Sequence, residues 1–183
     1  MRNILRNRLA LSTVVTTLII LVVSVLLAGV VTYFAINVTS TRVQEESLAL
    51  TKQHVWYDAA GSASQAAIMI INTGGRDIVI DKLSVRGQEV DWANVFYNVT
   101  DASISEDLKW VDSLSGTSTI TLNSVAYDLD ATTSDLTLQS GKTMIILIDS
   151  PDSITINDIG LTVAITVFTS QAMYYKETNV QAV

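Results

Sequence analysis

The sequence predicts an α+β protein, with one long hydrophobic helix at the N-terminus followed by an all-β antiparallel domain. A charge-free apolar run fills the first part of the chain, and short apolar segments alternate with polar turns in the rest. The length of 183 residues suits one small domain plus a membrane anchor. We divide the chain into a basic leader at 1–10, a hydrophobic helix at 11–51 and a β domain at 52–183.

The apolar run is long enough to cross a membrane. No charged residue occurs from Leu11 to Ile36, and the middle of the run reads LIILVVSVLLAGVV. About 20 apolar residues span the hydrocarbon core of a bilayer. A cleaved secretory signal has a shorter apolar region, of about 7–15 residues. We therefore expect a transmembrane helix that continues beyond the membrane, with one apolar face, as far as Thr51.

The charges on either side of the run predict its orientation. Arg2, Arg6 and Arg8 precede it, and no acidic residue occurs before Glu45. The positive-inside rule then places the N-terminus in the cytoplasm and the rest of the chain outside. Of the 11 basic residues three stay inside, which leaves eight outside against all 18 acidic residues. Such an acidic domain argues against a nucleic-acid partner, because nucleic-acid binding requires a basic surface.

The region beyond the helix reads as about seven short strands separated by polar turns. The strand signals are AAIMII (66–71), DIVIDKLSVRG (77–87), STITLNSV (118–125), DLTLQSG (135–141), KTMIILID (142–149) and a long final run at 160–183. The alternation of apolar residues breaks once, between Ile80 and Leu83, which predicts a β-bulge. We expect residues 87–117 to form a connection with one or two short strands. The even strand spacing predicts an Ig-like sandwich.

The sequence contains no recognisable catalytic machinery. It has no cysteine and one histidine, His54, so a serine–histidine–aspartate triad would have to use that residue. The motifs of a nucleophile elbow and of a phosphate-binding glycine loop are missing, and so is any histidine and carboxylate cluster at metal spacing. We expect no enzymatic activity, no cofactor and no disulfide.

Acidic residues gather in two of the predicted loops. Asp128, Asp130 and Asp135 surround one loop, and Asp149 and Asp152 lie on either side of Pro151. Calcium prefers oxygen ligands of this kind. The first loop lacks the glycine and the distal glutamate of an EF-hand, however. We interpret both clusters as solvated acidic loops and expect no metal site.

Two sequons lie in the part of the chain that we expect outside the cell. They are Asn37-Val-Thr and Asn98-Val-Thr, and both are candidates for N-glycosylation. Asn37 lies close to the expected membrane surface, so Asn98 is the better candidate for a glycan.

Small residues recur on one face of the apolar helix. Ser24, Ala28 and Thr32 are spaced four apart, and Gly29 lies beside them. In lipid, small residues let helix backbones approach closely and associate. The pattern therefore indicates a helix-packing interface. The alternative is an ordinary anchor that contains a few small residues.

The segment Arg8-Leu-Ala-Leu-Ser-Thr-Val-Val resembles the class III signal peptides of archaeal type IV pilins and archaellins. In these a short basic leader ends at a small residue directly before the hydrophobic helix. The resemblance implies cleavage by a prepilin-type peptidase between Ala10 and Leu11, followed by polymerisation of the chain with itself into a helical filament. The fifth residue after the cut is Val15, where the family pattern often has glutamate.

The filament interpretation implies a precursor in the cytoplasmic membrane and, after assembly, a cell-surface filament for adhesion or motility. Two alternatives stay open. One is an uncleaved, membrane-anchored accessory protein of the archaellum, similar to its stator proteins. The other is a membrane-tethered module that binds a solute or a cell-surface polymer.

Overall fold

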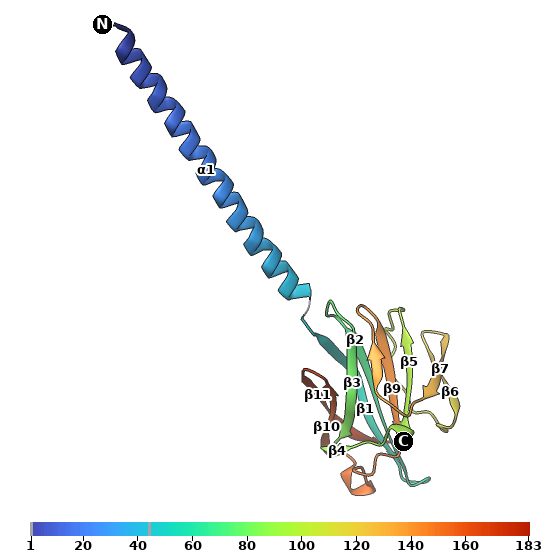
Figure 1. Ribbon diagram of the computed structural model, residues 1–183. Coiled ribbons are helices and arrows are strands. Elements are labelled where there is room, and N and C mark those ends of the chain that lie inside the picture. The colour runs from blue at the N-terminus through green and yellow to red at the C-terminus, as the bar shows by residue number, and fades with distance from the viewer. Residues whose placement is uncertain (1, 44) are drawn as a thin grey trace. The chain divides into compact units, whose positions relative to one another are not determined.

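The computed structural model describes residues 2–43 and 45–183, and the side chains of residues 11–40, 45–116 and 118–183. The chain forms two compact units, one up to residue 43 and one from residue 44 onward. The first is a single helix, and the second consists of strands and loops (Figure 1). The predicted class, a long N-terminal helix followed by a mostly antiparallel β domain, is confirmed.

The described residues contain eleven strands, where about seven were expected. The elements in chain order are α1 (Arg2–Val43), β1 (Leu48–Asp58), β2 (Ala63–Asn72), β3 (Ile78–Val85), β4 (Gln88–Glu89), the 3-10 turn η1 (Trp92–Asn94), β5 (Val95–Thr100), β6 (Thr117–Leu122), β7 (Val125–Ala131), β8 (Leu136–Leu138), β9 (Thr143–Asp149), the 3-10 turn η2 (Ile156–Asp158), β10 (Thr162–Thr169) and β11 (Met173–Ala182).

The helix ends earlier than the sequence pattern suggested. We expected it to continue to Thr51, but α1 ends at Val43 and residues 48–51 begin β1. Leu48 and Leu50 are both buried in the β domain. Their spacing of two suits a strand that packs one face on a core. The helical spacing that we assigned to this segment is therefore wrong.

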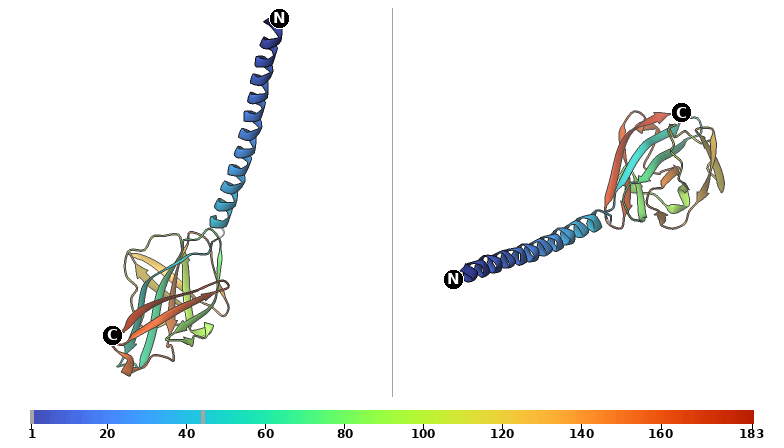
Figure 2. Two further views of the ribbon diagram at one scale, coloured as in Figure 1. Left: turned by 90° about the vertical axis from the view of Figure 1, so that its left-hand side faces the viewer. Right: turned by 90° about the horizontal axis from the view of Figure 1, so that it is seen from above.

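The strands form one continuous path in the order β4-β3-β10-β11-β1-β2-β9-β5-β7-β6, with β8 paired to β3. All pairings are antiparallel except that of β1 with β11, which is parallel over residues 55–57 and 180–182. Figure 2 shows the C-terminal strand, in red, beside the first strand, in teal. This short parallel pairing joins the two halves of the sheet.

The two halves of the sheet contribute to one apolar core. Ile68 and Ile146 come from the half that contains β2 and β9, and Leu83 and Ile165 come from the half that contains β3 and β10. All four side chains are almost fully buried. The expected two-layer packing therefore arises from a single strand path that folds over at β1 and β11.

Two β-bulges keep apolar side chains on this core. The bulge expected between Ile80 and Leu83 is confirmed, because the register between β3 and β10 shifts there. A second bulge, which we did not predict, lies in β1 at Lys52, whose φ is +53°. An extra residue reverses the alternation of a strand. Leu50 and Val55, five residues apart, consequently both face the same core.

Residues 101–116 cover the other face of the β2 and β9 half of the sheet. This segment, which we call the strap, contains no strand or helix. Its Ile104 and Leu108 pack with Met69, Ile145 and Leu147 in a second core. The central strands β2 and β9 are consequently buried on both faces, which explains why AAIMII and MIILI are continuous apolar runs.

Tight turns divide two segments that we predicted as single strands. Asn123 and Ser124, with φ of +50° and +63°, interrupt the predicted strand at 118–125 and form the turn between β6 and β7. Asp128 and Asp130, which we expected in a loop, lie in β7 instead. Residues 170–172 split the final run into β10 and β11. These turns account for part of the difference in strand number.

Candidate functional site

Among the described residues, the apolar helix is the most extensive unpartnered surface. Residues Leu11–Ser40 form an apolar stretch of 30 residues, in which the most apolar window of 18 residues has a mean hydropathy of 2.9. None of the stretch is buried. Leucine, isoleucine and valine side chains around the whole helix are exposed, most of them to half or more. A helix that is apolar on all sides needs lipid or other apolar helices around it. By length and composition this helix suits a membrane anchor or a signal sequence.

Four hydroxyl groups of this helix are bonded within the helix itself. Ser24 donates to the carbonyl oxygen of Ile20, and Thr32 donates to that of Ala28, both at 2.7 Å. Thr16 and Thr17 make similar bonds one turn back, at 2.9 Å. A polar group without a partner is costly in an apolar medium. Because these hydroxyls are paired, they do not oppose burial in lipid or in a helix bundle.

The predicted packing residues lie on this exposed helix. Ser24, Ala28 and Thr32 are all exposed, and they occur at every fourth position. A Cβ atom added at Gly29 would meet nothing within 4 Å. The helix itself therefore gives no steric reason for a glycine, although glycine is less favourable than alanine in a helix by about 1 kcal/mol.

The proposed cleavage point falls inside α1. Ala10 and Leu11 are consecutive helical residues, and the side chain of Leu11 is exposed. Cleavage between them would leave the apolar stretch at the very start of the chain. Whether the leader is removed stays a prediction.

The two sequons lie in different surroundings. Asn37 is an exposed residue of α1. Asn98 lies in β5, and its side-chain amide donates a hydrogen bond of 2.6 Å to the carbonyl oxygen of Asp128. A glycan would have to be attached to the same nitrogen. Glycosylation at both positions remains a prediction.

The single histidine is part of the contact between β1 and the strap. The Nε2 atom of His54 lies 3.0 Å from a carboxylate oxygen of Asp107. Its ring stacks on that of Trp56, with centroids 5.0 Å apart. Nδ1 is buried and has no hydrogen-bond partner in the described residues. This geometry joins a strap residue to the sheet and places no serine hydroxyl against the imidazole.

Two further polar side chains tie the strap to the sheet, and no sequence pattern indicated their role. Lys52, the bulge residue, donates to the carbonyl oxygens of Ser105 and Glu106 at 2.5 Å each. Gln65 is almost fully buried, and its amide pairs with both the N–H and the carbonyl oxygen of Val111, at 3.0 and 3.2 Å. The one sequence feature that could have indicated a bulge at Lys52 is the five-residue spacing of Leu50 and Val55 in β1.

The acidic residues that we singled out do not converge. Among the residues that the structure describes, no three histidine or carboxylate side chains are grouped so that they could hold a metal ion. Asp128 accepts a hydrogen bond from the hydroxyl of Thr119 at 2.9 Å. Partial burial at the end of β9 raises the pKa of Asp149. Asp130 and Asp135 are exposed.

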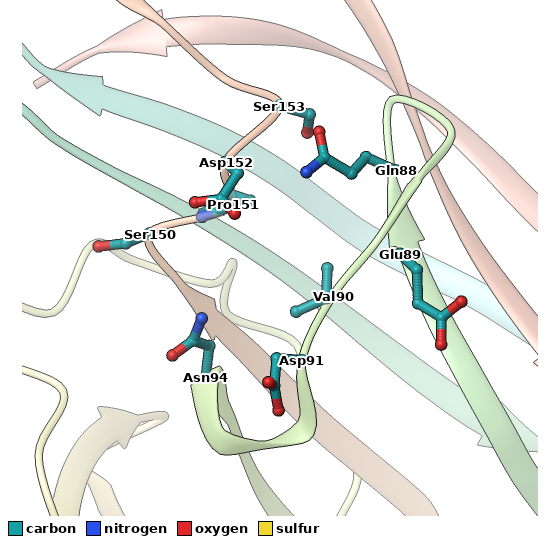
Figure 3. Close-up of a pocket in the computed structure, with 9 residues that line it drawn as sticks. All are labelled: Gln88, Glu89, Val90, Asp91, Asn94, Ser150, Pro151, Asp152 and Ser153. Atoms are coloured by element: carbon teal, nitrogen blue, oxygen red, sulfur yellow. The ribbon is translucent and has the colours of Figure 1, made fainter.

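A small polar cleft lies between β4, η1 and the loop that follows β9 (Figure 3). Its volume is about 110 Å³, and Gln88, Glu89, Val90, Asp91, Asn94, Ser150, Pro151, Asp152 and Ser153 line it. Several of its polar groups already serve the fold. Asp91 accepts from the N–H of Ala93 at 3.0 Å, and Ser153 donates to the carbonyl oxygen of Val85 at 2.8 Å. The cleft therefore does not define a ligand by its chemistry.

Comparison with known proteins does not place the chain in a family. No protein-family model matches it, and no curated protein matches it. One solved structure with some likeness is the ligand-binding region of Serine-glutamate repeat protein A (SgrA) of Enterococcus faecium. The identity is 16%, the match covers 76% of this chain and 98% of that chain, and the TM-score is 0.26. A TM-score this low supports neither a shared fold nor a shared function.

Proposed function

We propose that the chain is a structural subunit of an archaeal type IV pilus-like filament, which polymerises through α1 after removal of residues 1–10. The observation that carries the proposal is the 30-residue apolar stretch, none of which is buried against other described residues. Such a helix can leave the bilayer only if another apolar surface receives it. Copies of the same helix, packed side by side, supply that surface.

The chemistry of the helix surface supports close packing of this kind. The row of Ser24, Ala28 and Thr32, with Gly29 beside it, offers a face without large side chains, and the hydroxyls of that face are already paired within the helix. Small residues at an interface allow close backbone approach. In such a filament each subunit uses two different surfaces to contact its neighbours, so assembly continues without closing.

The β domain suits the outside of such a filament. It is predominantly acidic, and most of its large apolar residues are buried in two cores. We propose that it forms a hydrated outer layer that makes contact with the surroundings, in adhesion or in motility. This role requires no catalytic centre, cofactor or nucleic acid, and its partners are further copies of the chain, the membrane before assembly and a prepilin-type peptidase.

Determination of the N-terminus of the native protein tests the proposal. Mass spectrometry of surface filaments should find Leu11 as the first residue. The variant Ala10→Phe should keep its leader and form no filament, because the residue before the cut is then large. The control variant Asn3→Phe should be processed normally. A mature surface protein that begins at Met1 would reject the proposal and favour an uncleaved, anchored accessory protein.

A further inference from the structure

The β domain carries two apolar features at opposite ends. We define the proximal end as the end at which β1 begins, and the distal end as the end at which β1 finishes. The distal feature is the loop of residues 156–161, which we call the apolar loop. The proximal feature is a cavity of about 250 Å³ lined by Met69, Ile71, Asp101, Ala102, Ser103, Ile104, Gly141 and Thr143.

The strand pairing fixes these positions. Ile71 pairs with Thr143 and lies next to the pair of Asn72 with Leu48, the first residue of β1. The apolar loop instead adjoins β11 near its end, because the N–H of Val180 donates to the carbonyl oxygen of Leu161 at 2.9 Å. Figure 1 shows this loop, in orange, at the lower end of the β domain, opposite the turn between β2 and β3.

The apolar loop exposes three large aliphatic side chains within six residues. Ile156, Ile159 and Leu161 are 52%, 38% and 50% exposed. Single exposed apolar residues are common on protein surfaces, but contiguous groups of them mark interaction sites. Nothing in the described part of the β domain covers them.

The apolar loop is held in one shape by a buried carboxylate. Asp158 accepts hydrogen bonds of 2.8 Å from the N–H and the hydroxyl of Thr155, and its other oxygen lies 2.6 Å from the guanidinium of Arg86. The N–H of Gly160 donates to the carbonyl oxygen of Val180 at 2.8 Å. A loop fixed in this way presents its apolar side chains without a large loss of freedom on binding.

Both features are locally neutral in an otherwise acidic domain. The carboxylate of the apolar loop, Asp158, is paired with Arg86, and the carboxylate that lines the cavity, Asp101, lies 3.6 Å from the ammonium group of Lys142. Two copies of an acidic domain repel each other over most of their surfaces. These two places are therefore suited to contact between copies.

We propose that the apolar loop of one copy inserts into the proximal cavity of the next copy. β1 has 11 residues, which span roughly 35 Å when extended, so the loop cannot reach the cavity of its own domain. The contact joins two different surfaces and therefore propagates from copy to copy instead of closing a dimer. The inference rests on the proposed filament and adds to it a second, specific contact between β domains.

Cysteine cross-linking of the full chain tests this contact, because the natural chain has no cysteine. The double variant Ile159→Cys/Ala102→Cys places one thiol on the loop and one at the cavity. A disulfide forms only if the two Cα atoms lie within about 7 Å. We expect mild oxidation of assembled protein to give a ladder of covalent multimers. A second pair, Ile156→Cys/Ser103→Cys, checks the result with independent positions.

Matched controls separate this contact from general crowding. The pair Ile159→Cys/Tyr175→Cys keeps the loop thiol and moves the other to an exposed position on β11, and it should give no ladder. Each single cysteine variant should give dimers at most. Filaments that form normally but yield no ladder with either test pair would overturn this inference and leave the proposed function standing. If no filaments form, the same oxidation of the membrane fraction decides the question, and a result without a ladder there overturns the inference too.

Discussion

The guanidinium of Arg86, in the turn after β3, lies 2.6 Å from the carboxylate of Asp158, in η2, 72 residues further along the chain. The same guanidinium donates to the carbonyl oxygen of Ser153 at 3.1 Å. Asp158 also accepts two hydrogen bonds from Thr155, so this one carboxylate holds together the segment between β9 and β10. No pattern in the sequence indicated that these two residues pair.

This arrangement predicts an acid-sensitive stability of the β domain. Hydrogen bonds from the Thr155 hydroxyl and N–H, together with the Arg86 charge, lower the pKa of Asp158 below its ordinary value of 3.8. A carboxyl whose pKa is lower in the folded state stabilises the fold above its unfolded pKa, and this stabilisation is lost as the pH falls through the folded pKa. The variant Asp158→Asn should therefore be less stable than the natural chain at about pH 6, with a smaller difference at about pH 3.

Urea unfolding, followed by tryptophan fluorescence, measures this difference. All three tryptophans lie in the β domain, so the signal is independent of α1. Asp152→Asn, a change of an exposed aspartate in the preceding loop, is the control and should show no such dependence. A stability difference that stays constant or grows toward low pH would contradict the assignment of a lowered pKa to Asp158.

Ala28→Leu should prevent filament assembly and leave membrane insertion intact. Insertion depends on total hydrophobicity, which leucine increases by a few tenths of a kcal/mol. Close packing depends on local shape, and the extra carbons cost roughly 1–3 kcal/mol at each contact. Electron microscopy of cells detects filaments, and membrane fractionation confirms insertion.

The matched control for this variant is Val30→Leu, on the opposite face of α1. It should assemble normally, because it leaves the small-residue face unchanged. Normal filaments with Ala28→Leu would show that Ser24, Ala28 and Thr32 do not form an interface.

Gln65→Leu should destabilise the β domain by about 2 kcal/mol, because the partly buried N–H and carbonyl groups of Val111 lose their partners while the side-chain volume is kept. The strap should also become more susceptible to limited proteolysis. Gln53→Leu is the control, since Gln53 makes one long side-chain hydrogen bond of 3.3 Å at the surface. It should change the free energy of unfolding by no more than about 0.5 kcal/mol. Equal effects of the two variants would mean that Gln65 does not hold the strap.

Ser124→Gly should stabilise the hairpin of β6 and β7 by about 0.5–1 kcal/mol. Ser124 has a φ of +63°, and asparagine followed by glycine is the preferred sequence for a two-residue hairpin turn of this kind. Gly87→Ala is the opposite control, because Gly87 has a φ of +79° and should lose about 1 kcal/mol on substitution. The midpoints of urea unfolding give both values, and a destabilised Ser124→Gly would contradict the turn geometry.

The sequence by itself determined the features that depend on local periodicity and composition. A long run of apolar residues without charge predicts a single long helix. Such a helix needs lipid or other apolar helices around it, because all of its sides are apolar. The alternation in residues 78–85, with its single break, was enough to place a strand and its bulge correctly. The apolar runs that became β2 and β9 were identified as strands from their composition and the turn residues beside them.

The tertiary structure alone decided which segments meet. The helix end at Val43, the bulge at Lys52 and the strap over the second core depend on contacts between residues far apart in the chain. The pairing of Arg86 with Asp158 and that of Gln65 with Val111 are of the same kind. The sequence does not distinguish a polar residue that bonds to water from one that bonds to a distant group of the protein. Only the folded chain brings that distant partner into place.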